Sequence, residues 1–340
     1  MKIVLDAMGG DHAPEDIVRG AILASRSCRS ELILVGDESR IRPLLQAEPP
    51  EREIQVVHSD DNISMDDPAG PSLRQRKGAS MVLAANMVRD GKAQAFVCAG
   101  NTAALHQIAL TGVGRLPGIK RPALAVVFPT HPTPSIALDM GANADCRPEW
   151  LLQWAVMGSV YARLVLGRDN PRVGLLSLGS EEGKGNSLVA AVTPMLKQSD
   201  LNFVGNVEPT GFFRSQVDVA VCDGFSGNLI LKTGEAVAEW FMGQVRQAAS
   251  SSPLARLGGW LLRPALRSLA QSHDHSEYGG AMFLGLRGLV IKCHGRARAR
   301  TIENGIRVAE EILTSQLLTQ IEQSLERETA PSKATPCPTD

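Results

Sequence analysis

Short, unbroken apolar runs that end in glycine-rich turns are the feature that most constrains how this chain can fold. They recur along the sequence as KIVLDA, ELILVGD, AQAFVCAG, ALAVVFP, SIALDMG, RVGLLSLG, VDVAVCDG and GLVIKCHG. A strand with one solvated face alternates apolar and polar residues, whereas unbroken runs are typical of strands buried on both faces. The runs therefore predict a sheet enclosed between two layers.

Helical patterns fill the segments between these runs, as in EWLLQWAVMGSVYARLVLG and NSLVAAVTPMLKQ. Strands that alternate with helices predict a doubly wound α/β fold, in which helices cover both faces of a mainly parallel sheet. A chain of 340 residues is long enough for two domains or for one large unit. We expect one large α/β catalytic domain over residues 1–325.

Composition and charge narrow the class of protein. The chain is 44% apolar and 21% charged, which is ordinary for a globular protein, and its net charge of −1 argues against a nucleic-acid partner. It lacks the apolar core of a signal peptide and any long uncharged apolar stretch, so a cytoplasmic location is expected. The six cysteines lie far apart without a Cys-x-x-Cys pair, so we expect reduced thiols, no metal and no cofactor.

Four of the apolar runs lead to a glycine followed closely by an asparagine. The pairs end at Asn101, Asn143, Asn186 and Asn228. If all the strands are parallel, these turns gather on one edge of the sheet, where ligands bind in open α/β folds. Glycine allows backbone N–H groups to approach an anion, and helix N-termini favour negative charge. The alternative is that each asparagine only caps a helix.

The segment GSEEGKGNSL, residues 179–188, resembles a nucleotide-binding loop at first sight. The P-loop pattern requires a glycine where this chain has Leu178, and a serine or threonine where it has Gly185. The segment therefore does not indicate ATP, and a smaller anion is the better expectation.

A cationic amphipathic segment interrupts the strand–helix rhythm. Leu254, Leu257, Leu261 and Leu269 share one helical face, and three arginines lie on the other. Gly258-Gly259 and Pro264 predict a kinked helical hairpin insertion over about residues 234–277. Its apolar side is either a dimer interface or ordinary core, or a tip for membrane or partner contact formed by Leu257, Leu261 and Leu269. Residues 326–340 are polar and rich in proline and threonine, which predicts a disordered tail.

Several long motifs occur in one order along the chain: DAMGGDHAPE, SLRQRKGAS, AGNTAAL, GIKRPALA, LDMGANADCRPE, GLLSLGSEEGKGN, NFVGNVE, CDGFSGNLILKT and YGGA. Together they resemble the bacterial phosphate acyltransferases of phospholipid synthesis, which are acyl-ACP:phosphate transacylases. The resemblance covers Met1 to about residue 314. Three positions depart from the family pattern, at Ala103, Met282 and Arg296, which leaves the preferred acyl chain length open.

The resemblance implies a fold similar to phosphotransacetylases and isopropylmalate-type dehydrogenases. It also implies that inorganic phosphate and the acyl thioester of acyl carrier protein (acyl-ACP) react to form acyl phosphate, in the first step of phosphatidic acid synthesis. The family further implies a homodimer, peripheral contact with the inner face of the plasma membrane, and transfer of the product to a membrane glycerol-3-phosphate acyltransferase.

For this reaction we hypothesise direct attack of phosphate on the thioester, with Lys184 neutralising phosphate or the oxyanion and Asn228 donating to the acyl carbonyl. The phosphate-binding or substrate-binding candidates are Asp6, His12, Gly100, Asn101, Thr102, Asn143, Ser180, Gly183, Gly185 and Asn186. Arg74 and Lys77 are candidates for contact with the acidic carrier protein. Each of these residues also has a plain alternative as a cap, a turn residue or a solvated charge.

Other functions remain open at this stage. Cys98 or Cys222 could be an acyl-accepting nucleophile, although neither has a histidine close in sequence. A CoA-dependent phosphotransacetylase would use similar phosphate-binding turns, and a dehydrogenase is less favoured because no strand leads to a G-x-G-x-x-G turn. The amphipathic segment also suits a membrane-associated scaffold for lipid enzymes.

Overall fold

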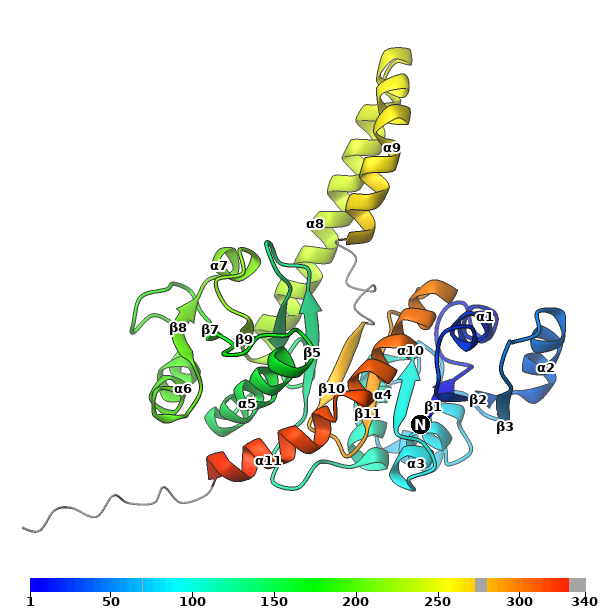
Figure 1. Cartoon of the computed structure of the whole chain (residues 1–340), viewed down its shortest axis with the longest axis horizontal. Coiled ribbons are helices and arrows are strands. Elements are labelled where there is room, and N and C mark those ends of the chain that lie inside the picture. Colours follow the sequence, from blue (N-terminus) through cyan, green and yellow to red (C-terminus); the bar gives the residue numbers. More distant parts are fainter. Residues whose placement is uncertain (69, 273–279, 330–340) are drawn as a thin grey trace, which may run out of the picture.

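The computed structural model describes residues 1–68, 70–272 and 280–329, and its described strands form a single 11-stranded sheet (Figure 1). The strand order is β3-β2-β1-β4-β11-β10-β5-β6-β9-β7-β8. In chain order the strands are β1 (Lys2–Asp6), β2 (Glu31–Gly36), β3 (Ile54–His58), β4 (Ala95–Cys98), β5 (Ala123–Phe128), β6 (Ser135–Leu138), β7 (Val173–Leu176), β8 (Phe203–Val207), β9 (Val219–Val221), β10 (Ala281–Leu284) and β11 (Leu289–Lys292).

Helices connect most of the strands, as the alternation predicts. They are α1 (Glu15–Ser25), α2 (Glu38–Ala47), α3 (Ser80–Arg89), α4 (Thr102–Ile108), α5 (Pro148–Leu164), α6 (Ser187–Gln198), α7 (Pro209–Phe213), α8 (Gly224–Ser250), α9 (Pro253–Ser272), α10 (Ala299–Thr314) and α11 (Leu317–Thr329), with short turns η1 (Pro71–Gln75) and η2 (Ala109–Val113). The doubly wound α/β fold expected from the sequence is confirmed.

Two apolar cores lie on the two faces of the sheet. Successive residues of one strand belong to different cores, since Ile3 and Leu5 of β1 share a core with residues of α1 and α10, whereas Val4 shares the other core with residues of α3. This division explains the unbroken apolar runs, because every residue of such a strand meets an apolar layer.

The sheet consists of two parallel halves that run in opposite directions. Strands β1, β2, β3, β4 and β11 are parallel to one another, and β6, β7, β8 and β9 form a second parallel set. Strands β10 and β5 join the halves, and each is antiparallel to both of its neighbours. We call this pair of strands the seam.

The opposite polarity makes one sequence expectation wrong, because the four glycine-asparagine turns do not share one edge of a parallel sheet. The register nevertheless brings strand ends from both halves to the seam. Lys292, the last residue of β11, is level with Ala281, which pairs with Val126 of β5. Leu138, the last residue of β6, pairs with Ala125, the residue of β5 directly before Val126. The carboxyl ends of both halves therefore flank the same short stretch of the seam.

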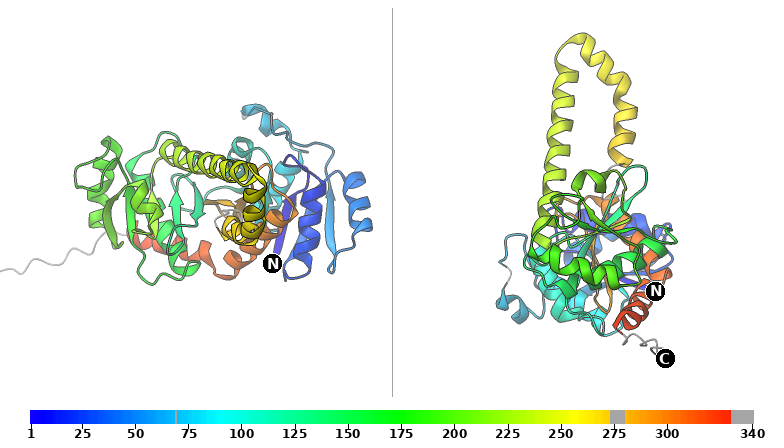
Figure 2. Two further views of the ribbon diagram at one scale, coloured as in Figure 1. Left: turned by 90° about the horizontal axis from the view of Figure 1, so that it is seen from above. Right: turned by 90° about the vertical axis from the view of Figure 1, so that its left-hand side faces the viewer.

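The helical hairpin of α8 and α9 projects from the sheet (Figures 1 and 2). It begins earlier than the sequence predicts, because α8 starts at Gly224 in the turn after β9 and continues unbroken to Ser250. Helix α9 also continues through Gly258-Gly259 and Pro264, since a proline removes one helical hydrogen bond without having to end the helix. In the part of the chain that the structure describes, no helix has the length and apolar character to cross a membrane.

The predicted tail begins too early. Residues 326–329 belong to α11, whose Leu317, Ile321 and Leu325 are buried against the rest of the core. The i, i+4 spacing of these leucine and isoleucine residues gives the helix one apolar face, and the helix ends at Thr329, after Leu325. The remainder of the predicted tail, 330–340, lies outside the described residues.

Candidate active site

A cavity of about 350 Å³ lies over the seam, on the face covered by α3, α4 and α8. Its apolar lining comes from Met65, Leu124, Val126, Met140, Leu231 and Ala281. Its charged lining residues are Asp11, Lys232, Glu235, Lys292 and Arg296, and its other polar side chains are Thr102, Asn228 and His294. A cavity of this size with a few convergent polar groups has the usual character of a small-molecule site.

Both halves of the sheet contribute to the cavity. Thr102 begins α4 after β4, and Lys292 ends β11, so these residues belong to the first parallel set. Gly141 follows β6, and Asn228 is the fifth residue of α8, the helix after β9, so these belong to the second. The site therefore exists only where the two halves meet.

Glycines allow the start of α8 to pack tightly against the turn after β6. A Cβ on Gly224 would lie 2.5 Å from the carbonyl oxygen of Asn143, and one on Gly141 would lie 3.2 Å from Oδ1 of Asn228. Asp223 caps α8 by accepting from the N–H of Ser226. These contacts fix Asn228 at the cavity wall.

The four asparagines of the glycine-asparagine turns prove to have different roles. Asn101 caps α4 and donates to the carbonyls of Met65 and Asp67, and Asn186 caps α6. Asn143 is buried and donates to Pro122 and Asp139. Only Asn228 lines the cavity, and in the described ranges its side-chain amide makes no hydrogen bond. Its amide is therefore available to a ligand.

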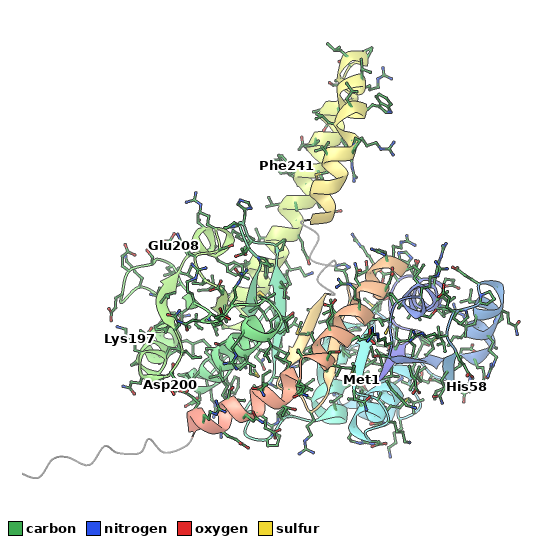
Figure 3. All side chains as sticks on the ribbon, in the orientation of Figure 1. Met1, His58, Lys197, Asp200, Glu208 and Phe241 are labelled. Atoms are coloured by element: carbon green, nitrogen blue, oxygen red, sulfur yellow. The ribbon has the colours of Figure 1, made fainter. Side chains whose placement is uncertain are left out.

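The loop that carries Lys184 lies at β7 and β8, the end of the sheet shown on the left in Figure 1, and is not part of the cavity lining. Its backbone is held by Asn206, which donates to the Lys184 carbonyl at 2.9 Å, and its Lys184 side chain is exposed. Lys197 of α6 marks this side of the molecule in Figure 3, and His58 of β3 marks the other. Lys184, Ser180, Gly183, Gly185 and Asn186 are therefore not among the residues that line the cavity with Asn228.

A buried polar cluster lies beside the cavity at the end of β1. Asp6 is 1% exposed and accepts hydrogen bonds from Ser80 Oγ at 2.6 Å and from the Met8 N–H at 3.1 Å. Burial raises the pKa of the Asp6 carboxyl above its usual value. Burial also raises the pKa of the nearby Cys98 thiol well above its usual value, and the neighbouring Asp6 charge adds to this effect. Cys98 therefore lacks the thiolate character of a nucleophile.

The remaining candidates lie around the site or away from it. Thr102 lines the cavity, Gly100 is buried beside it, and Asp11 rather than His12 contributes to the lining. Lys77 is exposed, and the side chain of Arg74 lies outside the described part of the structure. In the predicted hairpin tip, Leu257 and Leu261 are 55% and 63% exposed. The side chain of Leu269 lies outside the described part of the structure.

Sequence reasoning missed two of the cations that line the cavity, Lys232 and Lys292, and noted the third, Arg296, only as a departure from the family pattern. A usable signal was present for one of them. Lys292 is the only charged residue in the run GLVIKCHG, which otherwise reads as a buried strand. A lysine in such a place is rarely buried without a reason.

Most of the chain matches known proteins. Residues 1–320 match the family model described as "Fatty acid synthesis protein". A phosphate acyltransferase of Pelotomaculum thermopropionicum is 45% identical over 96% of this chain and 95% of its own length, and one of Geobacillus thermodenitrificans is 44% identical over 96% and 99%.

The chain belongs to this fatty acid synthesis protein family, whose similar curated members are phosphate acyltransferases, and it is a transferase of the acyltransferase class. Solved structures show the same fold at low identity. A phosphotransacetylase from Streptococcus pyogenes superimposes with a TM-score of 0.60 at 18% identity, over 96% of this chain and 94% of that one. One from Staphylococcus aureus has a TM-score of 0.57 at 18% identity, over 94% of each chain.

Proposed function

We propose that the protein transfers an acyl group from acyl-ACP to inorganic phosphate in the seam cavity, and that acyl phosphate is the product. The observation that carries this proposal is the combination, in one cavity, of apolar side chains, several cations and the amide of Asn228, which has no hydrogen-bond partner among the described residues. Such a lining can hold an acyl thioester and an anion side by side. This activity would form the first intermediate of phosphatidic acid synthesis.

The reaction needs positioning more than a strong base. A phosphate oxygen attacks the thioester carbonyl carbon, the carbon–sulfur bond breaks, and the carrier protein leaves as its thiolate. Phosphate is already largely dianionic near neutral pH, and a thiolate is a competent leaving group. Asn228 donates from its amide N–H to the carbonyl oxygen, which stabilises the negative charge that develops there.

The test is to incubate purified protein with palmitoyl-ACP and inorganic phosphate and to measure free carrier thiol. Thiol release that depends on phosphate, together with an acyl phosphate product trapped by hydroxylamine, is expected. Release at the same rate without phosphate would contradict the proposal, because that result describes a thioesterase.

Acyl-CoA is the alternative donor, since solved phosphotransacetylases share the fold. Replacing palmitoyl-ACP with palmitoyl-CoA and acetyl-CoA distinguishes the two functions. We expect a higher kcat/KM for the carrier-protein thioester. A preference for acetyl-CoA would assign the chain to the CoA-dependent reaction.

The proposed carrier contact involves Arg74, in η1, and the exposed Lys77, which precedes α3. Reversing both charges is expected to raise the KM for acyl-ACP and to leave the KM for phosphate unchanged, because surface charges steer the acidic partner. Equal changes in both values would argue against the contact.

The role predicted for Lys184 stays a prediction. If this side chain serves the transition state, Lys184→Ala lowers turnover by about 100-fold or more. A near-normal rate and phosphate KM would leave the cationic role to residues that line the cavity.

The projecting hairpin suggests peripheral membrane contact or a homodimer, as two further parts of the proposal. Its exposed apolar side chains include Trp240, Phe241, Leu257, Trp260 and Leu261, and Figure 3 shows Phe241 on the part of α8 beyond the sheet. Contact with the inner face of the plasma membrane would bring the product to a glycerol-3-phosphate acyltransferase.

Vesicle flotation and light scattering separate these two proposals. The double variant Leu257→Glu and Leu261→Glu is expected to lose vesicle binding and to keep its activity on dissolved substrate. A change of molecular mass with unaltered vesicle binding would instead indicate that this face joins two copies.

A further inference from the structure

Lys292 is a buried lysine whose only described partners are backbone carbonyls. It ends β11 and is 7% exposed, and its Nζ donates to the carbonyl of Cys293 and to that of Ala99 at 3.4 Å. In the residues that the structure describes, no carboxylate forms an ion pair with it. An ammonium group in such surroundings is costly unless a further partner compensates its charge.

The position of Lys292 at the cavity suggests what that partner is. Lys292 lines the cavity from the first parallel set of strands, and Asn228 lines it from the second. An ammonium group has three N–H donors, and the two carbonyls account for two of them. We infer that Lys292 binds the attacking phosphate, through the N–H that the carbonyls of Ala99 and Cys293 leave unused. This inference rests on the proposed function, whose phosphate site it assigns.

The other cations of the cavity are less suited to this task. Lys232 forms an ion pair with Glu235 at 2.8 Å, and its side chain is 56% exposed. Arg296 is exposed as well. Water and salt screen exposed charges, whereas a buried charge acts on a nearby anion through a less polar medium. Lys292 is therefore the cation with the strongest effect on a phosphate inside the cavity.

Its protonation also responds to an anion. Burial lowers the pKa of the Lys292 ammonium below its usual value, and the nearby Lys232 acts in the same direction. A dianion beside Lys292 favours the charged form, so binding of phosphate would hold the proton on Nζ. The two carbonyls fix the direction of the ammonium group, which places the anion beside the acyl carbon that Asn228 holds from the other side of the seam.

Lys292→Met tests the inference, because methionine fills similar space without the charge. Lys92→Met is the matched control. Lys92 is exposed and lies just before the amino end of β4, whereas Lys292 lies at the carboxyl end of the neighbouring parallel strand β11. We expect Lys292→Met to raise the KM for phosphate by at least 10-fold and to lose the increase in Tm that phosphate gives the unmodified protein. The KM for the acyl donor should change by less than threefold, and Lys92→Met should match the unmodified protein in all three values.

A purely structural role for Lys292 predicts a different result. In that case Lys292→Met has a lower Tm in the absence of phosphate, but phosphate still raises its Tm and its KM for phosphate is unchanged. That outcome would overturn the inference. The Tm measurement needs no acyl donor, so it remains informative if the donor proves to be acyl-CoA. If the unmodified protein shows phosphate-dependent stabilisation but forms no acyl phosphate, the proposed function fails while the binding role of Lys292 is still decided.

A measurement on the unmodified protein covers the case in which Lys292→Met does not fold. Amines are labelled by reductive methylation, with and without inorganic phosphate, and the labelled lysines are identified by mass spectrometry. Phosphate is expected to protect Lys292 at least fivefold and to leave Lys92 unaffected. Equal labelling of Lys292 in both samples, or protection of Lys184 alone, would refute the inference.

Discussion

Gly141 and Asn228 are in direct contact across the join between the β6 turn and helix α8. A Cβ on Gly141 would lie 3.2 Å from both Cβ and Oδ1 of Asn228, and Gly141 has a φ of 122°. The absence of a side chain at Gly141 therefore determines where the amide of Asn228 lies.

Gly141→Ala is expected to displace Asn228 and to lower kcat/KM by about 10-fold or more, because misplacement of a donor weakens its bond to the transition state. Gly118→Ala is the control, since Gly118 also has a positive φ but nothing within 4 Å of a Cβ. Both changes should cost about 1 kcal/mol of stability through backbone strain. Equal activity in the two variants would contradict the role of Gly141 in positioning Asn228.

Asn228→Ala removes the cavity amide that has no hydrogen bond in the described structure. We expect kcat to fall on the order of 100-fold, because one oxyanion donor has about this effect. The Tm should change little, since the side chain is exposed and supports no other residue. Thermal unfolding and steady-state kinetics on the same sample check both parts. A large loss of Tm with nearly normal kcat would contradict the assigned role.

Cys98→Ser is expected to keep activity within about threefold of the unmodified protein. The thiol is buried, its pKa is raised, and it faces Asp6 at 3.6 Å, so it is poorly suited to attack a thioester. A serine hydroxyl can donate to the same carboxyl group. Isolation of a stable acyl-enzyme that disappears in Cys98→Ser would restore the covalent mechanism.

Asp6 makes the stability of the protein depend on pH. Because its pKa is raised in the folded state, the folded chain binds more protons than the unfolded chain at pH values between the usual carboxyl pKa and the raised one. The free energy of unfolding of the unmodified protein, relative to Asp6→Asn, should therefore increase as the pH falls from about 7 toward about 4. Urea unfolding at several pH values measures this difference. A difference that decreases over this range would contradict the raised pKa.

The central strands could be predicted from sequence because they are buried on both faces. Strands β3, β8 and β10 were not among the predicted runs; β10 is a short central strand of four residues, and β3 and β8 are the two edges of the sheet. Their burial is partial, as in β8, where Val204 is exposed and Val207 is buried. An edge strand with mixed burial lacks the unbroken apolar run on which the prediction depends.

The direction of each strand could not be predicted, because an unbroken apolar run has the same pattern in a parallel and in an antiparallel strand. The antiparallel seam could therefore not be predicted, and neither could the cavity that lies over it. Asn228 could be proposed from its turn, but nothing local distinguishes it from the caps Asn101 and Asn186. Their roles depend on which backbone groups they meet after folding. Lys292 had a local signal, a charge within a strand, but its cavity is made by residues distant in sequence.

The seam also bears on how the chain folds during synthesis. Strands β10 and β11 lie between β4 and β5, yet residues 281–292 leave the ribosome after all of the other described strands. Until then, β4 and β5 present unpaired edges that can join other chains. A nascent chain that stalls before residue 281 would carry both edges exposed, so premature termination there should yield aggregates and not a smaller active enzyme.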